Sequence, residues 1–417
     1  MSELRRSLGV ADAVVIGAGS MLGAGVFAVW GPAADAAGAW LLLGLAIAGV
    51  VAFCNATSSA QLAARHPESG GTYVYAREEL SPFWGHVAGW GFVVGKTASC
   101  AAMALTAGAY IWPERRVLIA NLAVVTVFSV NLGGLSRTVR VTRWLLGITM
   151  TTIVVALGSG IGAPRVTIDW SLGSTSPLDV LRSAGLIFFA FAGYARIATL
   201  GEEVREPART IPRAIPRALG AVLVVYAIVA IMVIATLPGA LLGDDATPLR
   251  SVVEAGPLAA LGPLVPIGAA IACGGVLLNL IPGVSRTVLA MSRRRELPKF
   301  LSAVNVRRAT PLRAETTVVI AVLVLVNTLD LGSSIAVSGV AVLTYYAITN
   351  ASALAMPREA RIWNPSVAVA GLIGCVALIA SLPVTAILGG GLTLLAGVIA
   401  RYAAARTALC PGPRAGA

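Results

Sequence analysis

Residues 14–27 read VVIGAGSMLGAGVF, an apolar run interrupted by four glycines and a serine. The glycine spacing is compatible with a dinucleotide-binding turn. It is also compatible with close packing between two membrane helices, because Gly19 and Gly23 form a small-xxx-small pair. A third interpretation is a membrane helix that is broken near its middle. The rest of the chain decides between these three.

The composition indicates an integral membrane protein. Of the 417 residues, 57% are hydrophobic and 12% are charged, and the mean hydropathy is +0.85. Soluble domains carry about twice that charged fraction. The five cysteines show no spacing typical of a metal site or a disulfide framework, so no metal or cofactor is expected.

Twelve segments are apolar enough, and about long enough, to cross a hydrocarbon core of roughly 30 Å as helices. They are expected at 9–31, 38–60, 84–110, 116–133, 143–162, 179–200, 214–238, 258–285, 315–331, 333–355, 364–382 and 384–402. The predicted fold class is therefore an all-α membrane protein with about twelve transmembrane helices.

The distribution of basic residues predicts the orientation. With the N-terminus in the cytoplasm, the cytoplasmic segments carry 24 of the 31 Lys and Arg residues and the outer loops carry four. Because basic residues are enriched on the cytoplasmic side, both termini are expected in the cytoplasm, with the protein in the plasma membrane. The net charge of +12 then reflects topology and contact with anionic lipid, and no nucleic-acid partner is required.

The interrupted stretch has a counterpart five spans later. The segment SAGLIFFAFAGYARIATL (183–200) contains Gly185 and Gly193 within an apolar span. Paired interrupted spans in corresponding halves of a chain indicate the binding site of a secondary transporter. Because five is odd, a second repeat at 179–355 is expected to be inverted relative to a first at 9–162. Two further helices (364–402) and two tails (1–8 and 403–417) complete the expected organisation.

This organisation favours the broken helix. A dinucleotide fold needs a parallel sheet and an acidic residue at a strand end, whereas Asp35 lies in GPAADAAG. Helix packing alone remains an alternative, although each glycine weakens a helix by roughly 1 kcal/mol relative to alanine. Freed amides at 20–25 would bind a carboxylate, and freed carbonyls near Gly193 would accept hydrogen bonds from an ammonium group. A zwitterionic amino acid presents both groups.

At these residues the sequence resembles the amino acid–polyamine–organocation superfamily of secondary transporters. The resemblance rests on GSMLGAGVF (19–27), on FFAFAGYARIATLGEEVREPARTIPRAI (188–215), and on SRTVLAMSRRRELPKF (285–300) followed by Thr310-Pro311, with GW at 89–90. It covers nearly the whole chain. It implies two inverted five-helix repeats with broken first and sixth helices, two additional helices, and alternating access.

The resemblance also implies the substrate-binding residues. Gly23, Ala24 and Gly25 correspond to a carboxylate-binding turn, and Ser20 lies just before it. Phe189 corresponds to a bulky gate. The residues expected to contact the amine and the side chain, or to line the pocket, are Ala192, Gly193 and Leu278.

Two departures from the family pattern concern charge. Some proton-coupled relatives carry a lysine in the fifth span, but LLGITMTTIVV (145–155) has none. Some relatives that exchange basic amino acids carry a glutamate two residues after the sixth-span glycine, where this chain has Ala195. This chain therefore lacks the lysine that some proton-coupled relatives carry and the glutamate that some relatives exchanging basic amino acids carry.

Two charges lie well within predicted spans, Lys96 and Arg196. Charges within the membrane are costly and usually functional. Lys96 is one of only two lysines against 29 arginines, and lysine can release a proton when it is buried. It is the candidate for proton coupling or for a pocket charge that disfavours cationic substrates; the alternative is a structural lysine. Arg196 is expected to have a structural role.

The remaining polar candidates lie near the predicted cytoplasmic mouth. Glu202 and Glu203 are expected to form a gate or a solvated face, and Ser285 is a possible ligand for a sodium ion.

The sequence therefore predicts a transporter of neutral amino acids that is coupled to protons. An exchanger without ion coupling, a carrier of small amines and a channel are alternatives. An intramembrane enzyme is disfavoured, because the sequence contains no HExxH motif, no GxSxG elbow and no acidic metal motif.

Overall fold

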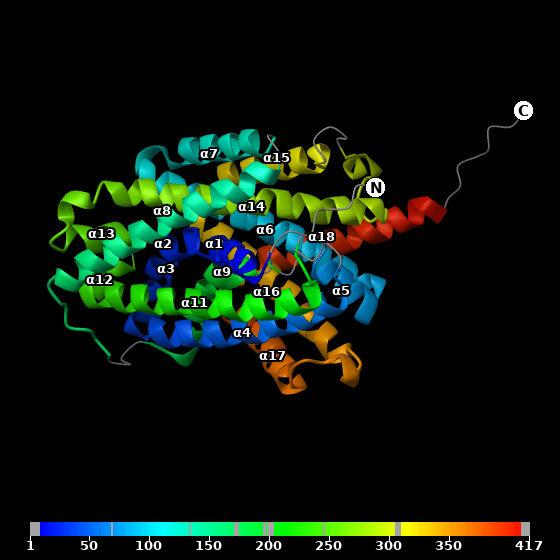
Figure 1. Ribbon diagram of the computed structural model, residues 1–417, viewed down its shortest axis with the longest axis horizontal. Coiled ribbons are helices and arrows are strands. Elements are labelled where there is room, and N and C mark those ends of the chain that lie inside the picture. Colours follow the sequence, from blue (N-terminus) through cyan, green and yellow to red (C-terminus); the bar gives the residue numbers. More distant parts are fainter. Residues whose placement is uncertain are drawn as a thin grey trace, which may run out of the picture.

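The computed structural model describes residues 9–67, 70–132, 135–170, 175–194, 197, 204–243, 245, 247–304 and 310–409. This part of the chain contains helices and no β-strand. The long helices run roughly along the longest axis of the molecule, with α5 (Thr72–Glu79) at one end and α12 (Gly239–Leu242) and α13 (Pro248–Glu254) at the other (Figure 1).

The first membrane segment is broken at the predicted place. Helix α1 (Val10–Met21) ends at Leu22, whose φ of −77° and ψ of 57° form an inverse γ-turn. The Gly23 amide closes this turn by donating to Met21 O at 2.8 Å. The chain then continues as α2 (Ala24–Ala28) and α3 (Trp30–Ala37).

The second break is also at the predicted place. Helix α9 (Pro177–Phe191) begins with a capping box between Ser176 and Asp179 and with proline at its first position. It ends in a short 3-10 turn, η3 (Ala192–Tyr194). The α-helical hydrogen-bond pattern is therefore lost at Gly193, as its sequence predicts.

The other long helices surround these two broken segments. They are α4 (Leu41–Arg65), α6 (Pro82–Ile111), α7 (Arg116–Asn131), α8 (Leu135–Gly162), α11 (Pro207–Thr236), α14 (Leu264–Arg293), α15 (Leu312–Thr328), α16 (Leu331–Ala355), α17 (Pro365–Ser381) and α18 (Val384–Leu409). Short 3-10 helices occupy Gly38–Trp40, Pro113–Arg115, Ala259–Leu261, Lys299–Ser302 and Arg358–Ala360.

Within the described residues, eight helical segments are long and apolar enough to cross a membrane. They are Val10–Ala28, Trp30–Arg65, Pro82–Ile111, Trp144–Gly162, Pro207–Thr236, Leu264–Arg293, Leu331–Ala355 and Val384–Tyr402. The other four predicted spans coincide with α7, α9, α15 and α17, which have 16, 15, 17 and 17 residues. The all-helical membrane class is confirmed, whereas twelve crossings and the inverted repeats remain predictions.

Several helix boundaries differ clearly from those expected from hydropathy, including the start of α8 at Leu135 rather than at 143. Helix α11 begins at Pro207 rather than at 214, because proline fits the first helical turn and the charged segment before the apolar run is already helical. Helix α14 begins at Leu264 rather than at 258 and continues to Arg293. Apolar character therefore located the spans, and it was a poor guide to their ends.

Burial distinguishes central helices from peripheral ones. In the apolar stretch of α6, 89% is buried inside the protein, whereas in the apolar stretch of α18 only 17% is buried. Helix α6 contacts α7, α14, α15 and α16, and α11 contacts both α1 and α4. The broken segments therefore lie among the long helices (Figure 1), and the low burial of α18 places it at the outside of the bundle.

A group of charged residues joins α5, α6 and α18 just beyond the end of α14. We call Glu296, Arg77, His86 and Arg401 the Glu296 cluster. Glu296 Oε1 lies 2.6 Å from Arg77 Nη1 and 3.3 Å from Arg401 Nη1, and its Oε2 lies 3.4 Å from His86 Nδ1. Burial acts to raise the pKa of Glu296, but the hydrogen bond and charge of His86, the Tyr73 hydroxyl and the charge of Arg77 lower it overall.

Candidate substrate site at the two helix breaks

The two breaks are in direct contact with each other. A Cβ atom added to Gly193 would overlap the backbone oxygen of Ser20, at the end of α1. A Cβ atom added to Gly25, in α2, would lie 2.7 Å from the Cα atom of Ala190 in α9. We call Ser20–Gly25 and Ala190–Gly193 together the helix-break contact. Two of the predicted glycines are thus required by close backbone approach, which is a physical reason for glycine there.

One tyrosine joins the free ends of both broken helices. Tyr226 of α11 is completely buried, and its Oη lies 2.7 Å from Met21 O and 3.1 Å from Ala190 O. Both carbonyls lie near the C-terminal end of a helix, where the regular hydrogen bonds run out. Tyr226 therefore shares its single hydroxyl hydrogen between the broken ends of α1 and α9.

A lysine and a second tyrosine meet at the end of α9. Lys96 lies in the middle of α6 and is 3% exposed, and its Nζ donates to Ala192 O at 2.7 Å. Tyr346 of α16 donates to the same oxygen at 3.2 Å. No carboxylate among the described residues lies within 4.0 Å of Lys96 Nζ. A cation at this place is favoured by the negative end of the α9 dipole.

Aromatic rings pack on the side of α9 that faces α16. Phe188 meets Tyr346 edge-on with ring centroids 5.8 Å apart, and Tyr194 stacks on Tyr346 at 5.0 Å. Tyr345 packs against Tyr346 at 5.1 Å. These contacts hold the Tyr346 ring in one orientation, so its hydroxyl is directed at the end of α9.

Helix α14 covers the first break through small residues. A Cβ atom added to Gly23 would overlap the side chain of Val276 and lie 3.6 Å from Ala272 O. Leu278, predicted to line the pocket, is buried two positions further along α14. Ser285 is also buried, and its Oγ donates to Ile281 O within its own helix at 2.7 Å.

The other predicted residues have varied surroundings. Ser20 is buried and its hydroxyl donates to Ile16 O at 2.8 Å, so its backbone rather than its side chain faces Gly193. Phe189 is buried and Ala24 begins α2. Arg196, Glu202 and Glu203 lie outside the described residues.

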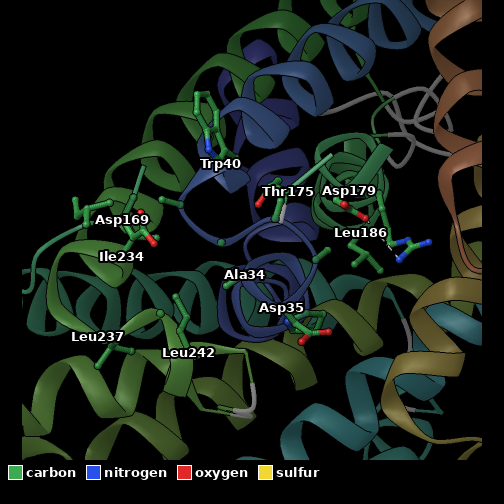
Figure 2. Close-up of a pocket in the computed structure, with 18 of the residues that line it drawn as sticks. Ala34, Asp35, Trp40, Asp169, Thr175, Asp179, Leu186, Ile234, Leu237 and Leu242 are labelled. Atoms are coloured by element: carbon green, nitrogen blue, oxygen red, sulfur yellow. Dashed lines mark ion pairs between the residues drawn. The ribbon is translucent and has the colours of Figure 1, made fainter. Parts of the chain in front are cut away.

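A large cavity lies elsewhere, between the end of α3, the start of α9 and the end of α11. Its volume is about 1020 Å³, and Asp35, Asp169, Asp179 and Leu186 are among the residues that line it (Figure 2). None of the predicted substrate-binding residues lines this cavity. Despite its size, this cavity is therefore not the predicted substrate site. The backbone groups predicted to bind the substrate lie at the helix-break contact.

The sequence analysis did not single out Tyr226 and Tyr346. A buried tyrosine hydroxyl usually needs a hydrogen-bond partner, so a tyrosine inside an apolar span is a signal for a polar contact. Both tyrosines lie in such spans. The sequence could have marked them as polar contacts, but it could not have named their carbonyl partners.

The fold and the site together define a class of protein. It is a helical membrane protein in which two interrupted helices meet inside the bundle, where Tyr226 contacts a carbonyl from the end of each. Such a pair of discontinuous helices is typical of secondary transporters.

Comparison with known proteins identifies the family. The family model described as amino acid permease matches residues 8–399, so the chain belongs to that family. A Mycobacterium tuberculosis (strain ATCC 25618 / H37Rv) protein named as an uncharacterized transporter is 52% identical over 403 residues, which cover 95% of this chain and 91% of that protein. The protein is therefore a transporter and not an enzyme.

Two more distant relatives have names that specify substrates. The branched-chain amino acid permease BcaP of Bacillus subtilis (strain 168) is 25% identical over 335 residues, covering 74% of this chain and 72% of that protein. The vacuolar cationic amino acid transporter 2 of Arabidopsis thaliana is 26% identical over 341 residues, covering 75% of this chain and 53% of that protein. Amino acids are therefore the substrate class of the family.

Proposed function

We propose that this permease is a secondary active transporter that moves neutral amino acids across the cytoplasmic membrane by alternating access, coupled to protons. In this proposal residues 9–162 and 179–355 form two inverted five-helix repeats, residues 364–402 add two helices, and both termini are cytoplasmic. The observation that carries the proposal is the direct contact between the two broken helices.

The substrate carboxylate would bind at the start of α2. The amide of Gly23 is already used by Met21 O, which leaves the amides of Ala24 and Gly25 at the first turn. Helical hydrogen bonds continue past Val29 into α3, from Val29 N to Gly25 O and from Ala33 N to Val29 O. A continuous helical run thus places its positive end at the proposed carboxylate position.

The substrate ammonium and side chain would bind at the second break. The carbonyl of Ala192 points to the same place as the Lys96 and Tyr346 donors, so it is available to an ammonium group only in competition with them. In the proposal Phe189 and Leu278 contribute apolar surface for the side chain, and Ser20 and Gly193 shape the backbone around it.

The charge of Lys96 supports a neutral substrate rather than a cationic one. Lys96 is buried, with no described carboxylate within salt-bridge distance, and a second buried cation beside it would be repelled. One distant relative is named for branched-chain substrates and others for cationic substrates. The buried charge of Lys96 therefore favours neutral substrates, such as branched-chain amino acids, over cationic ones for this chain.

Lys96 is also the proposed proton-coupling residue. Lysine can lose its proton when desolvated, whereas arginine cannot. A Lys96 side chain that changes partner during transport would change its proton affinity with each partner. Sodium coupling through Ser285 is less favoured, because the Ser285 hydroxyl is engaged with Ile281 O.

The experiment that tests the function is uptake of labelled amino acids into proteoliposomes containing the purified full-length protein, with and without an inward proton gradient. We expect concentrative uptake of neutral amino acids only with the gradient, and little uptake of lysine or arginine. Lys96→Ala should remove the dependence on the gradient. Gradient-independent exchange would contradict proton coupling, and absence of flux for every amino acid would contradict the proposed substrate class.

A further inference from the structure

The carbonyl oxygen of Ala192 has its hydrogen-bonding capacity filled by two side chains from different helices. Lys96 Nζ of α6 lies 2.7 Å from it and Tyr346 Oη of α16 lies 3.2 Å from it. A carbonyl oxygen has two lone pairs, so these two donors account for both. A third donor can bind there only if one of the two leaves.

Of the two donors, the lysine is the one that can leave. The Tyr346 ring is packed against Phe188, Tyr194 and Tyr345, which fixes its hydroxyl. Lys96 is held by a flexible four-carbon chain, and among the described residues its one hydrogen-bond partner is Ala192 O. Its charge has no described carboxylate within 4.0 Å, so this single contact and the α9 dipole stabilise it.

The ammonium group of Lys96, which would leave Ala192 O, and the substrate group that would replace it are of the same chemical kind. The α-ammonium group of an amino acid and the side-chain ammonium group of lysine each offer three donors and one positive charge. Two such cations cannot share one buried carbonyl, because they repel each other and compete for the same lone pair.

We propose that the Lys96 ammonium group is an intramolecular competitor for the substrate ammonium group at the carbonyl of Ala192. This inference rests on the proposed function and adds the group that controls ammonium recognition. Substrate binding displaces Lys96 from Ala192 O, and Lys96 returns when the substrate is released. The second lone pair of Ala192 O therefore has a donor with or without substrate, while Tyr346 occupies the first.

This competition has a consequence for the transport cycle. A carrier that returns without substrate is more stable when both lone pairs of the Ala192 carbonyl are occupied, and Tyr346 occupies only one of them. Lys96 supplies the second donor. Without Lys96 the substrate ammonium becomes the better partner for Ala192 O, so exchange of substrate for substrate should continue while net flux slows.

The experiment compares a transported amino acid with its deaminated analogue, for example leucine with 4-methylpentanoate, as inhibitors of tracer exchange in proteoliposomes. The variant is Lys96→Met, which keeps an unbranched side chain and removes the donor. The matched control is Thr106→Val, which alters another buried residue of α6 whose hydroxyl donates to Ala102 O of the same helix.

In Lys96→Met we expect leucine to inhibit at a concentration about tenfold lower than in the wild type, the scale of one charged hydrogen bond. Inhibition by 4-methylpentanoate should stay the same, because that ligand has no ammonium group. Net efflux should fall about tenfold relative to exchange. Thr106→Val should change neither the ratio of the two inhibitors nor the ratio of net efflux to exchange.

Equal changes for leucine and 4-methylpentanoate in Lys96→Met would overturn the inference, since Lys96 would then act on the carboxylate or on folding. An unchanged leucine value would also overturn it. If Lys96→Met cannot be purified, Lys96→Gln removes the charge and keeps a donor, and the same direction with a smaller change is expected. Wild-type protein that transports no amino acid would contradict the proposed function instead, and that result is obtained before any variant is compared.

Discussion

The helix-break contact and the Glu296 cluster both hold distant segments together, but they use different kinds of interaction. Both join segments that are far apart in the sequence, and both are largely buried. At the helix-break contact the partners are backbone carbonyls, glycines and single donors such as Tyr226. In the Glu296 cluster, Glu296 pairs with the opposite charges of Arg77 and Arg401 and also contacts His86.

The difference indicates which region can exchange partners. A carbonyl that accepts from one ammonium group can accept from another at little cost, so the helix-break contact suits a ligand. A carboxylate that accepts from two arginines and a histidine loses all three contacts if it moves, so the Glu296 cluster suits a fixed joint. It ties α18, otherwise the most exposed of the long spans, to α5 and α6.

The largest effect is expected from Gly193→Ala. The added methyl group would overlap the Ser20 backbone oxygen, which cannot move away as a side chain could. We expect a loss of about 3 kcal/mol of stability and loss of transport, measured by thermal unfolding in detergent and by proteoliposome uptake. Gly220→Ala is the matched control, because nothing lies within 4 Å of the added atom. Equal behaviour of the two variants would contradict the close contact of the breaks.

The next effect is expected from Glu296→Gln. The change leaves Arg77 and Arg401 without their shared carboxylate, and both arginines are about a quarter exposed, which moderates the cost. We expect the free energy of unfolding to fall by about 2 kcal/mol, while the affinity for substrate stays unchanged.

Glu206→Gln serves as the control for that variant. It breaks an ion pair with Arg209 in which both side chains are largely exposed, so the stability should change by no more than about 0.5 kcal/mol. A substrate affinity that falls with Glu296→Gln would show that the two regions are not separate in function.

A smaller effect on stability is expected from Tyr226→Phe. The ring and its packing remain, while the hydroxyl shared by Met21 O and Ala190 O is lost. We expect a loss of about 1 kcal/mol in stability together with weaker substrate binding. Thermal unfolding and equilibrium binding on the same preparation test this. A stability loss with unchanged binding would place Tyr226 outside the site.

The smallest effect is expected from pH acting on the Glu296 cluster. The pKa of Glu296 is lowered from its ordinary value of 4.5 in the folded protein, so its ionised form contributes stability above that value. This contribution should be lost as the pH falls below 4.5 through the folded pKa. The wild type should therefore lose more thermal stability than Glu296→Gln between pH 6 and pH 4. Parallel losses would contradict the sign of the shift.

Much of the fold could be predicted from the sequence because membrane spans depend on composition. Within the described residues, each of the twelve predicted spans overlaps a helix, and both breaks lie at the predicted glycines. Helix ends were less predictable, as the start of α11 at Pro207 shows, because polar residues can extend a helix beyond the apolar run. The Glu296 cluster was missed, since an acid within the basic stretch SRRRELPKF gives no sign that its partners lie on α5 and α18.

The sequence by itself determined where the chain could break, because glycine clusters weaken a helix locally whatever surrounds them. It also determined that Lys96 is a charge in the middle of an apolar span, which composition alone reveals. Only the tertiary structure decided that Gly193 meets Ser20 O and that Lys96 meets Ala192 O, 96 positions away along the chain. Hydrogen bonds are short-ranged and directional, so a buried polar group is satisfied by whichever partner packing brings within about 3 Å.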